Sequence, residues 1–162
     1  MTLIPHQQLD LFIASASDIS PKEQQDLMAR CWFSLAKQKR TEPIEHSFGD
    51  SWVKITGKSE IGLATIFDND ILIFVIAQYM AHLNNKNNTQ PPGRRFQFTG
   101  YEFWKFVGKK RFSGKGYTDL WSSLERLHHT FVETNIHLHK SRRHHSFNWL
   151  SEIKQVVEDD KH

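Results

Sequence analysis

The pattern of apolar and polar positions divides the chain into an irregular first third and a more periodic remainder. Residues 1–20 show little periodicity, and we expect an amino-terminal arm there. Pro21 favours the start of a helix over PKEQQDLMARCW, because proline suits the first helical turn. The runs PIEHSF and SWVKIT flank Gly49 and Asp50, and this turn chemistry predicts a β-hairpin over residues 43–56. The first third is therefore expected to form a small strand-containing layer.

The clearest helical pattern follows Asp68, which we expect to be its N-cap. Apolar residues recur at helical spacing from Ile71 to Leu83, where the Asn-rich run NNKNNTQPPG stops the pattern. These residues cover most of the circumference, which predicts a buried central helix. Residues 84–93 are then expected to form a surface loop.

Two further helices and a second hairpin are predicted in the second half. Residues 95–98 alternate like a short strand, and Thr99 is expected to cap a helix that ends near Gly108. A second helix is predicted from about Tyr117 to His129, because apolar residues recur at helical spacing. Its expected buried stripe is Tyr117, Leu120, Trp121, Leu124 and Leu127. Two strand-like runs follow, one over 131–140 and one containing Phe147 and Trp149, and the basic turn KSRRHH joins them.

This order of strand, helix, turn, helix, strand, basic turn and strand is typical of a winged-helix domain. We therefore expect an α+β fold, a winged helix-turn-helix with a β-hairpin wing and a small amino-terminal strand-containing layer. One domain for DNA binding or dimerisation is expected over residues 21–155. Residues 156–162, VVEDDKH, form an acidic tail.

Charge is distributed unevenly along the chain. Residues 86–145 contain 12 lysines and arginines against 4 acidic residues, whereas the rest contains 9 against 14. Such a basic half suits a polyanionic partner, although a solvated surface is the alternative. Short polar side chains on the second helix would let it approach base edges. The candidate DNA-binding residues are Arg94, Arg95, Lys109, Lys110, Arg111, Lys115, Thr118, Ser122, Arg126, Lys140, Arg142 and Arg143.

Catalytic and metal chemistry find little support in the sequence. The run SGKG lacks the full phosphate-loop pattern and does not follow a strand. His137 and His139 share a strand face and His144 and His145 lie across the turn, but no cysteine or carboxylate stands at ligand spacing. We therefore expect a non-enzymatic protein without a cofactor or a metal.

The remaining observations concern the compartment. Cys31 is the single cysteine, so no internal disulfide can form, and its apolar neighbours favour a buried structural thiol. No apolar run approaches the roughly 18 residues that a membrane span needs. The first residues also lack the pattern of a secretion signal. These features predict a cytoplasmic protein.

Two segments resemble a known family. GLATIFDNDILIF, from Gly62 to Phe74, and GYTDLWSSLERLHHTFVETNI, from Gly116 to Ile136, are similar to the plasmid replication initiator protein A family. The resemblance covers roughly residues 30–155. It implies a bacterial initiator that binds origin DNA with two winged-helix domains in tandem and works with host replication proteins. Residues 156–162 would then begin a linker to a missing second winged-helix domain.

The sequence thus predicts the amino-terminal domain of a plasmid replication initiator, binding double-stranded origin DNA, dimerising, or both. The alternatives are a protein-protein dimerisation module that does not contact DNA and a winged-helix transcriptional regulator. Trp32, Phe33, Phe48 and Trp52 exceed what the small first layer is expected to bury. This excess predicts an exposed apolar patch and a homodimer through it.

Overall fold

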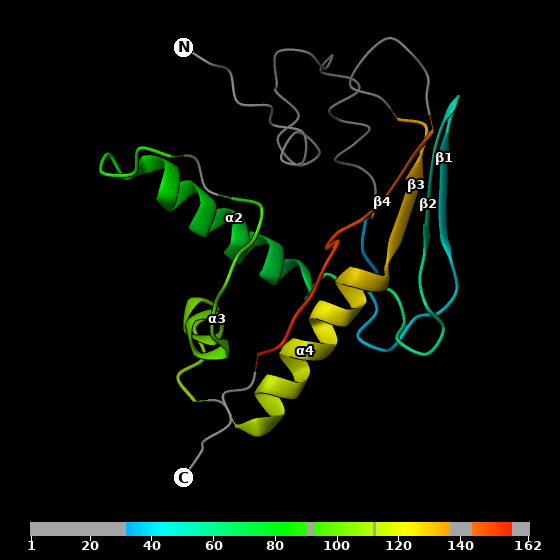
Figure 1. The fold of residues 1–162 in the computed structure, drawn as a ribbon. Helices are drawn as coiled ribbons and strands as arrows, with labels where there is room; N and C mark the ends of the chain where they lie inside the picture. The colour runs from blue at the N-terminus through cyan, green and yellow to red at the C-terminus, as the bar shows by residue number, and fades with distance from the viewer. Residues whose placement is uncertain (1–31, 91–92, 112, 137–143, 157–162) are drawn as a thin grey trace.

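The fold combines helices with one antiparallel sheet, in a computed structural model that describes residues 32–90, 93–111, 113–136 and 144–156. Figure 1 shows the helices on one side of the sheet and gives the labels used below. The described elements are β1 (Ile44–Phe48), β2 (Ser51–Thr56), α2 (Asn69–Asn84), α3 (Gly100–Phe106), α4 (Gly114–His129), β3 (Phe131–Thr134) and β4 (His145–Asn148). The predicted α+β class is confirmed. The arm over 1–20 and the helix expected from Pro21 lie outside the described residues.

The sheet joins the two predicted hairpins into one unit. Its strand order is β1-β2-β3-β4, and every neighbouring pair is antiparallel. The hairpin of β1 and β2 is confirmed, with Gly49 at φ 52° in the turn, a backbone conformation that favours glycine. A separate amino-terminal layer was the wrong expectation. Val53 and Ile55 of β2 pair with β3 and are buried together with Val132, so the first third contributes half of the central sheet.

Helix α2 is buried only along its first turns. Ile71, Leu72 and Phe74 belong to the core, but Ile73 and Met80 are exposed. The prediction of a helix buried on all sides is therefore wrong for the carboxyl-terminal half. Figure 1 shows the reason, since this half of α2 runs away from the sheet.

The residues before α3 form no strand, contrary to the prediction for 95–98. Their alternation serves another purpose, because two aromatic side chains of this segment pack on α2. The ring of Phe98 lies 5.2 Å from that of Phe74, and the ring of Phe96 lies 6.2 Å from that of Tyr79. Thr99 then caps α3 in a complete capping box with Glu102, as predicted.

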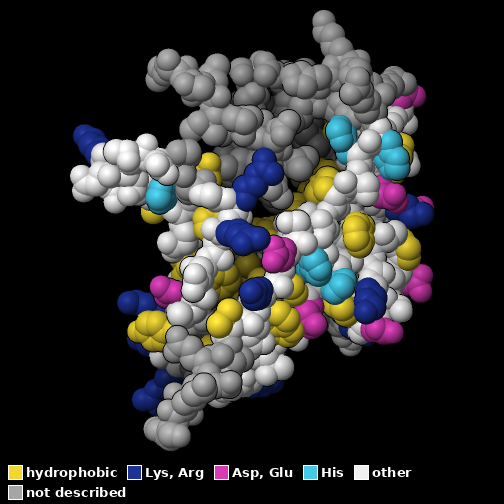
Figure 2. Space-filling view, viewed as in Figure 1, with side chains coloured by type: hydrophobic (Ala, Val, Ile, Leu, Met, Phe, Trp, Pro, Cys, Tyr) yellow, Lys and Arg dark blue, Asp and Glu magenta, His cyan; other side chains and the backbone are white. Residues whose placement is uncertain are grey.

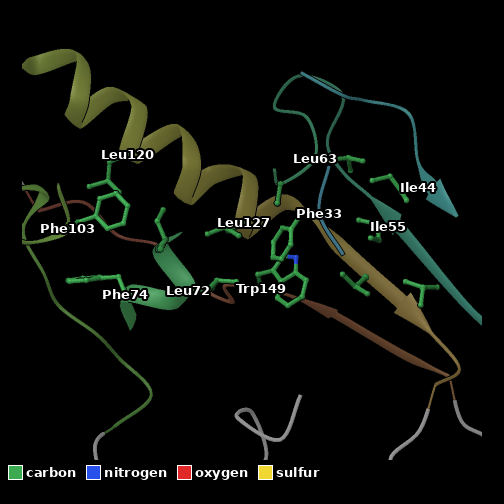
Figure 3. Packing of buried hydrophobic residues seen from close by; sticks show 14 of the residues in the cluster. Phe33, Ile44, Ile55, Leu63, Leu72, Phe74, Phe103, Leu120, Leu127 and Trp149 are labelled. Atoms are coloured by element: carbon green, nitrogen blue, oxygen red, sulfur yellow. The ribbon is translucent and has the colours of Figure 1, made fainter. Parts of the chain in front are cut away.

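Helix α4 joins the sheet to the other helices. It begins at Gly114, three residues before the predicted start, and its most buried side chain is Leu127. Figure 3 shows Leu127 and Leu72 beside Phe33 and Trp149, while Leu120 lies near the aromatic residues of α2 and α3. The expected buried stripe is only partly correct, because Tyr117 is half exposed.

Three of the aromatic residues expected in an exposed patch, Trp32, Phe33 and Trp52, are buried or half-buried. The ring of Phe33 stacks on that of Trp149 with centroids 4.9 Å apart, and Trp32 meets the same ring edge to face at 6.5 Å. Trp52 is half-buried beside His144. The sequence did not reveal this burial because the covering rings, those of Trp149 and His144, come from the far end of the chain.

Candidate nucleic-acid interface

Helices α3 and α4 are joined by a turn and pack closely against each other. The indole Nε1 of Trp104 in α3 donates to the carbonyl oxygen of Gly116 in α4, at 3.2 Å. The ring of Tyr117 lies against Gly100, so closely that a Cβ at this position would come within 2.5 Å of the ring. A glycine at the start of α3 therefore sets how near α4 can approach.

The turn between the two helices carries a cluster of positively charged residues. Lys109, Lys110 and Arg111 are exposed, and Lys115 follows in the first turn of α4. Lys109 places its Nζ 3.9 Å from the ring centroid of Trp104, a cation-π contact that fixes the base of the turn. On the face drawn in Figure 2, basic side chains line the edge over α3 and the following turn, while most acidic side chains lie over the sheet.

The first turn of α4 adds to this positive potential. It contains no acidic residue, and Ser113 makes no side-chain cap hydrogen bond. The free N–H groups of a helix start carry about half a positive charge, which favours phosphate nearby. The helix start and Lys115 therefore both favour binding of an anion.

The outer face of α4 has an exposed amino-terminal half, the open half, and a partly buried carboxyl-terminal half, the closed half. Lys115, Thr118 and Asp119 are exposed, whereas Ser122 is half-buried. The Thr118 hydroxyl donates to the carbonyl oxygen of Gly114 at 3.2 Å, which leaves its oxygen as an acceptor toward solvent. Short exposed side chains near the amino-terminal end suit close approach to a groove.

Arg126, one of the candidate DNA-binding residues, lies in the closed half, and its side chain is only 25% exposed. Its Nε and Nη2 atoms donate to the two carboxylate oxygens of Asp68 at 2.8 and 2.7 Å, and Nη2 also donates to Ser123. The Asp68 side chain has no exposed area. The hydrogen bond to Asp68 raises the pKa of Arg126 above its ordinary value. Arg126 is therefore held by protein and is left out of the DNA surface proposed below.

Asp68 is the N-cap residue of α2, as predicted, but its side chain has a different role. It makes no cap hydrogen bond to α2; instead it accepts from the backbone N–H and the hydroxyl of Thr65, at 2.8 and 3.1 Å. Asp68 thus accepts hydrogen bonds in the way the last residue of a capping box does, with Thr65 as the first residue of the box. The spacing Thr65-x-x-Asp68 is the sequence signal for this contact. The partner on α4 could not be found this way, because it lies 58 residues further along the chain.

The other candidate residues lie away from this turn or cannot be placed. Arg94 is exposed, and Arg95 forms an exposed ion pair with Glu152 at 3.4 Å. Arg95 also lines a groove of about 750 Å³ between α2 and α3, together with Phe96 and Phe106. The antiparallel pairing of β3 with β4 confirms the second hairpin. The basic residues of its turn, Lys140, Arg142 and Arg143, lie outside the described residues.

The described residues show neither a cluster of metal ligands nor a membrane-spanning helix. Within the part of the chain that the structure describes, no three His, Cys, Asp or Glu side chains come together to hold a metal ion. His137 and His139 are outside that part. Among the described helices, none is long and apolar enough to cross a membrane.

The arrangement defines an α+β domain in which a four-stranded antiparallel sheet packs with helices, and a basic turn joins α3 to α4. The chain belongs to the replication initiator protein A family, whose model matches residues 22–162. It is 33% identical over 117 residues to a protein of Wigglesworthia glossinidia brevipalpis named "Putative replication protein", covering 72% of this chain. The chain spans 41% of the length of that relative.

A solved structure shares the fold. A crystal structure of selenomethionine derivatives of domains 2 and 3 of RctB matches with a TM-score of 0.55 and 12% sequence identity. The match covers 78% of this chain and 48% of the RctB chain. At this identity the likeness concerns the fold alone.

Proposed function

We propose that this chain is a DNA-binding domain of a plasmid replication initiator and that it binds double-stranded origin DNA without catalysing a reaction. In this proposal the fold acts as a winged helix. The exposed half of α4 lies in the major groove, and the hairpin of β3 and β4 is the wing, which reaches phosphates or the minor groove beside it. Membership of the replication initiator protein A family supports the link to replication.

The observation that carries the proposal is the coincidence of shape and charge at the start of α4. A helix with its side chains is about 10–12 Å wide, and the major groove is about 12 Å wide, so α4 fits if its leading face carries short side chains. Thr118 and Ser122 are short, and Lys110, Arg111 and Lys115 flank this face. Lys140, Arg142 and Arg143 would add phosphate contacts from the wing. Arg94 and Arg95 would reach only the edge of such an interface.

The salt dependence of binding tests this proposal. Replacing both Lys110 and Arg111 with Ala should weaken binding to every duplex alike and reduce the slope of log K against log salt by about one to two units, at about 0.9 per phosphate contact. The measurement is a fluorescence anisotropy titration at several salt concentrations. The matched control removes two cations from β2 and the loop after it, Lys54→Ala with Lys58→Ala, and should leave the slope unchanged. Equal slopes for the two double variants would remove the turn from the interface.

A second role, homodimerisation, is favoured by one observation on α2. Its exposed apolar residues Ile73, Met80 and Leu83 recur at the spacing of a single helical stripe, which is the usual mark of a protein-binding face. This stripe replaces the aromatic patch expected from the sequence. The assembled initiator would then open the origin together with host replication proteins, and this domain would bind the DNA.

Light scattering tests the dimer separately from DNA binding. Met80→Glu places a charge in the middle of the stripe and should halve the mass in solution while leaving the salt slope unchanged, because α2 lies apart from the basic turn. A matched control is Gln78→Glu, which adds the same charge on the same helix beside the stripe. A monomeric mass for the unmodified chain at tens of micromolar would contradict the dimer and leave the DNA proposal intact.

A further inference from the structure

The carboxyl-terminal end of α4 is held at two points by one short loop, residues 64–68. The first point is the ion pair in which Arg126 donates two hydrogen bonds to the carboxylate of Asp68. The second is Thr130, the C-cap residue of α4, whose Oγ1 accepts from the backbone N–H of Ala64 at 2.8 Å. Both Asp68 and Thr130 are fully buried.

The loop itself is anchored to the rest of the fold. The backbone N–H of Ser34 donates to Ala64 at 2.8 Å, and the N–H of Ile66 donates back to Ser34 at 3.0 Å. Thr65 uses both its N–H and its hydroxyl to orient the Asp68 carboxylate. The loop itself therefore orients the Asp68 carboxylate, and the orientation of this carboxylate in turn fixes that of Arg126 on α4.

This ion pair is more buried than the other pairs of Lys or Arg with a carboxylate among the described residues. The pairs Lys54 with Glu45, Lys58 with Glu60 and Arg95 with Glu152 all have side chains at least 42% exposed. The Arg126 side chain is 25% exposed and that of Asp68 not at all. A buried pair often adds little net stability over an apolar pair of the same size, but its planar two-bond geometry specifies one orientation.

We propose that Asp68, Arg126 and Thr130 are positioning residues that set the angle at which α4 is presented to DNA. This inference rests on the proposed function of α4. Thr118 lies eight residues before Arg126, about 12 Å along the helix axis at about 1.5 Å per residue. A tilt of about 10° at the held end would move Thr118 by about 2 Å. Hydrogen bonds to base edges tolerate only a few tenths of an ångström around their usual length of about 2.9 Å. We call Asp68, Arg126 and Thr130 the clamp. Loss of the clamp would therefore weaken recognition of the DNA sequence more than contacts to phosphate.

The test replaces the pair with apolar side chains of similar size, Asp68→Leu with Arg126→Met. The matched control does the same to the exposed pair on the sheet, Glu45→Leu with Lys54→Met. Binding is measured to a duplex selected from a randomised library by the unmodified chain and to a scrambled duplex of the same composition. We expect the clamp variant to lose at least tenfold in the ratio of the two affinities, with its salt slope on the scrambled duplex unchanged. The control should keep the ratio within twofold.

A second measurement decides the positioning role without DNA. Spin labels are placed at Thr118→Cys and Ser47→Cys in a Cys31→Ser background, and the distance distribution between them is recorded by pulsed electron spin resonance. The clamp variant should broaden this distribution and the control should not. If the clamp variant does not fold, Arg126→Lys takes its place, because it keeps the charge and loses the two-bond geometry.

The outcomes separate the two proposals. An unchanged distribution together with an unchanged affinity ratio overturns the positioning role while leaving DNA binding by α4 in place. If the unmodified chain does not distinguish the two duplexes, the proposed reading function fails, and the distance distribution alone then supports or overturns the positioning of α4.

Discussion

Glu102 shows how a single carboxylate defines the start of α3. Its Oε2 accepts from the backbone N–H of Thr99 at 2.7 Å and from the Thr99 hydroxyl at 2.9 Å, and the hydroxyl oxygen accepts in turn from the N–H of Glu102 at 3.2 Å. The hydrogen bond from the Thr99 backbone, followed by that from its hydroxyl, lowers the pKa of Glu102 below its ordinary value of 4.5. The start of α3 therefore depends on an ionised carboxylate.

The depressed pKa predicts the direction of a pH effect. A carboxyl group whose folded pKa is lowered stabilises the fold at pH values above its unfolded pKa, and this contribution disappears as the pH falls through the folded pKa. In a two-dimensional NMR titration, the amide resonance of Thr99 should shift with a midpoint below 4.5. Glu102→Gln is the control and should abolish the shift. A midpoint at or above 4.5 would mean that the capping box is not formed in solution.

Individual residues were predictable where their partners are near in sequence. Thr99 was identified as a cap because Glu102 lies three residues away, inside the same helical turn. Arg126 was assigned to DNA because its helical position faces outward from the apolar stripe. Only the fold reveals that the loop before α2 places a buried Asp68 opposite it.

At the scale of elements, the proposed groove contact rests on the amino-terminal half of α4. The half is exposed and begins beside the basic turn, whereas the other half is fixed through Arg126 and Leu127. A helix held at one end and open at the other presents its first turns, which is how recognition helices meet base edges.

Thr118→Glu should therefore abolish specific duplex binding, because a carboxylate at this exposed site would repel phosphate. The melting temperature should stay within a few degrees, since an acidic side chain near a helix start is favourable to the helix. Ser47→Glu is the control, adding the same charge at an exposed position of β1. Binding by Thr118→Glu at the level of this control, measured by anisotropy, would show that α4 does not face DNA.

The elements themselves were predicted unequally. Three helices and two hairpins were found because their periodicity and turns are local signals. The strand expected over 95–98 failed because alternation describes any segment with one apolar face, and here that face packs on α2 through Phe96 and Phe98. The burial of α2 was overestimated because an apolar stripe that stays exposed, as at Ile73 and Met80, has the same sequence pattern as one in a core.

At the scale of the whole molecule, the sheet couples the near-neutral first third to the basic half. β2 pairs with β3 at Val53 with Thr134 and Ile55 with Val132, and β3 leads directly from α4. The hairpin that we propose as a wing is thus extended by two further strands. The sequence predicted both hairpins but not their union, because pairing between strands about 80 residues apart leaves no local pattern.

The most direct test of DNA binding by α4 is a map of the amide resonances that move when the labelled chain is titrated with duplex DNA. If α4 enters the major groove, the largest changes should fall on residues 109–120, with further changes in the hairpin of β3 and β4. Residues 44–50 of β1 and its turn should be nearly unaffected, because they form the far edge of the sheet. Changes confined to α2 or to β1, or none at all at low salt, would contradict DNA binding by α4.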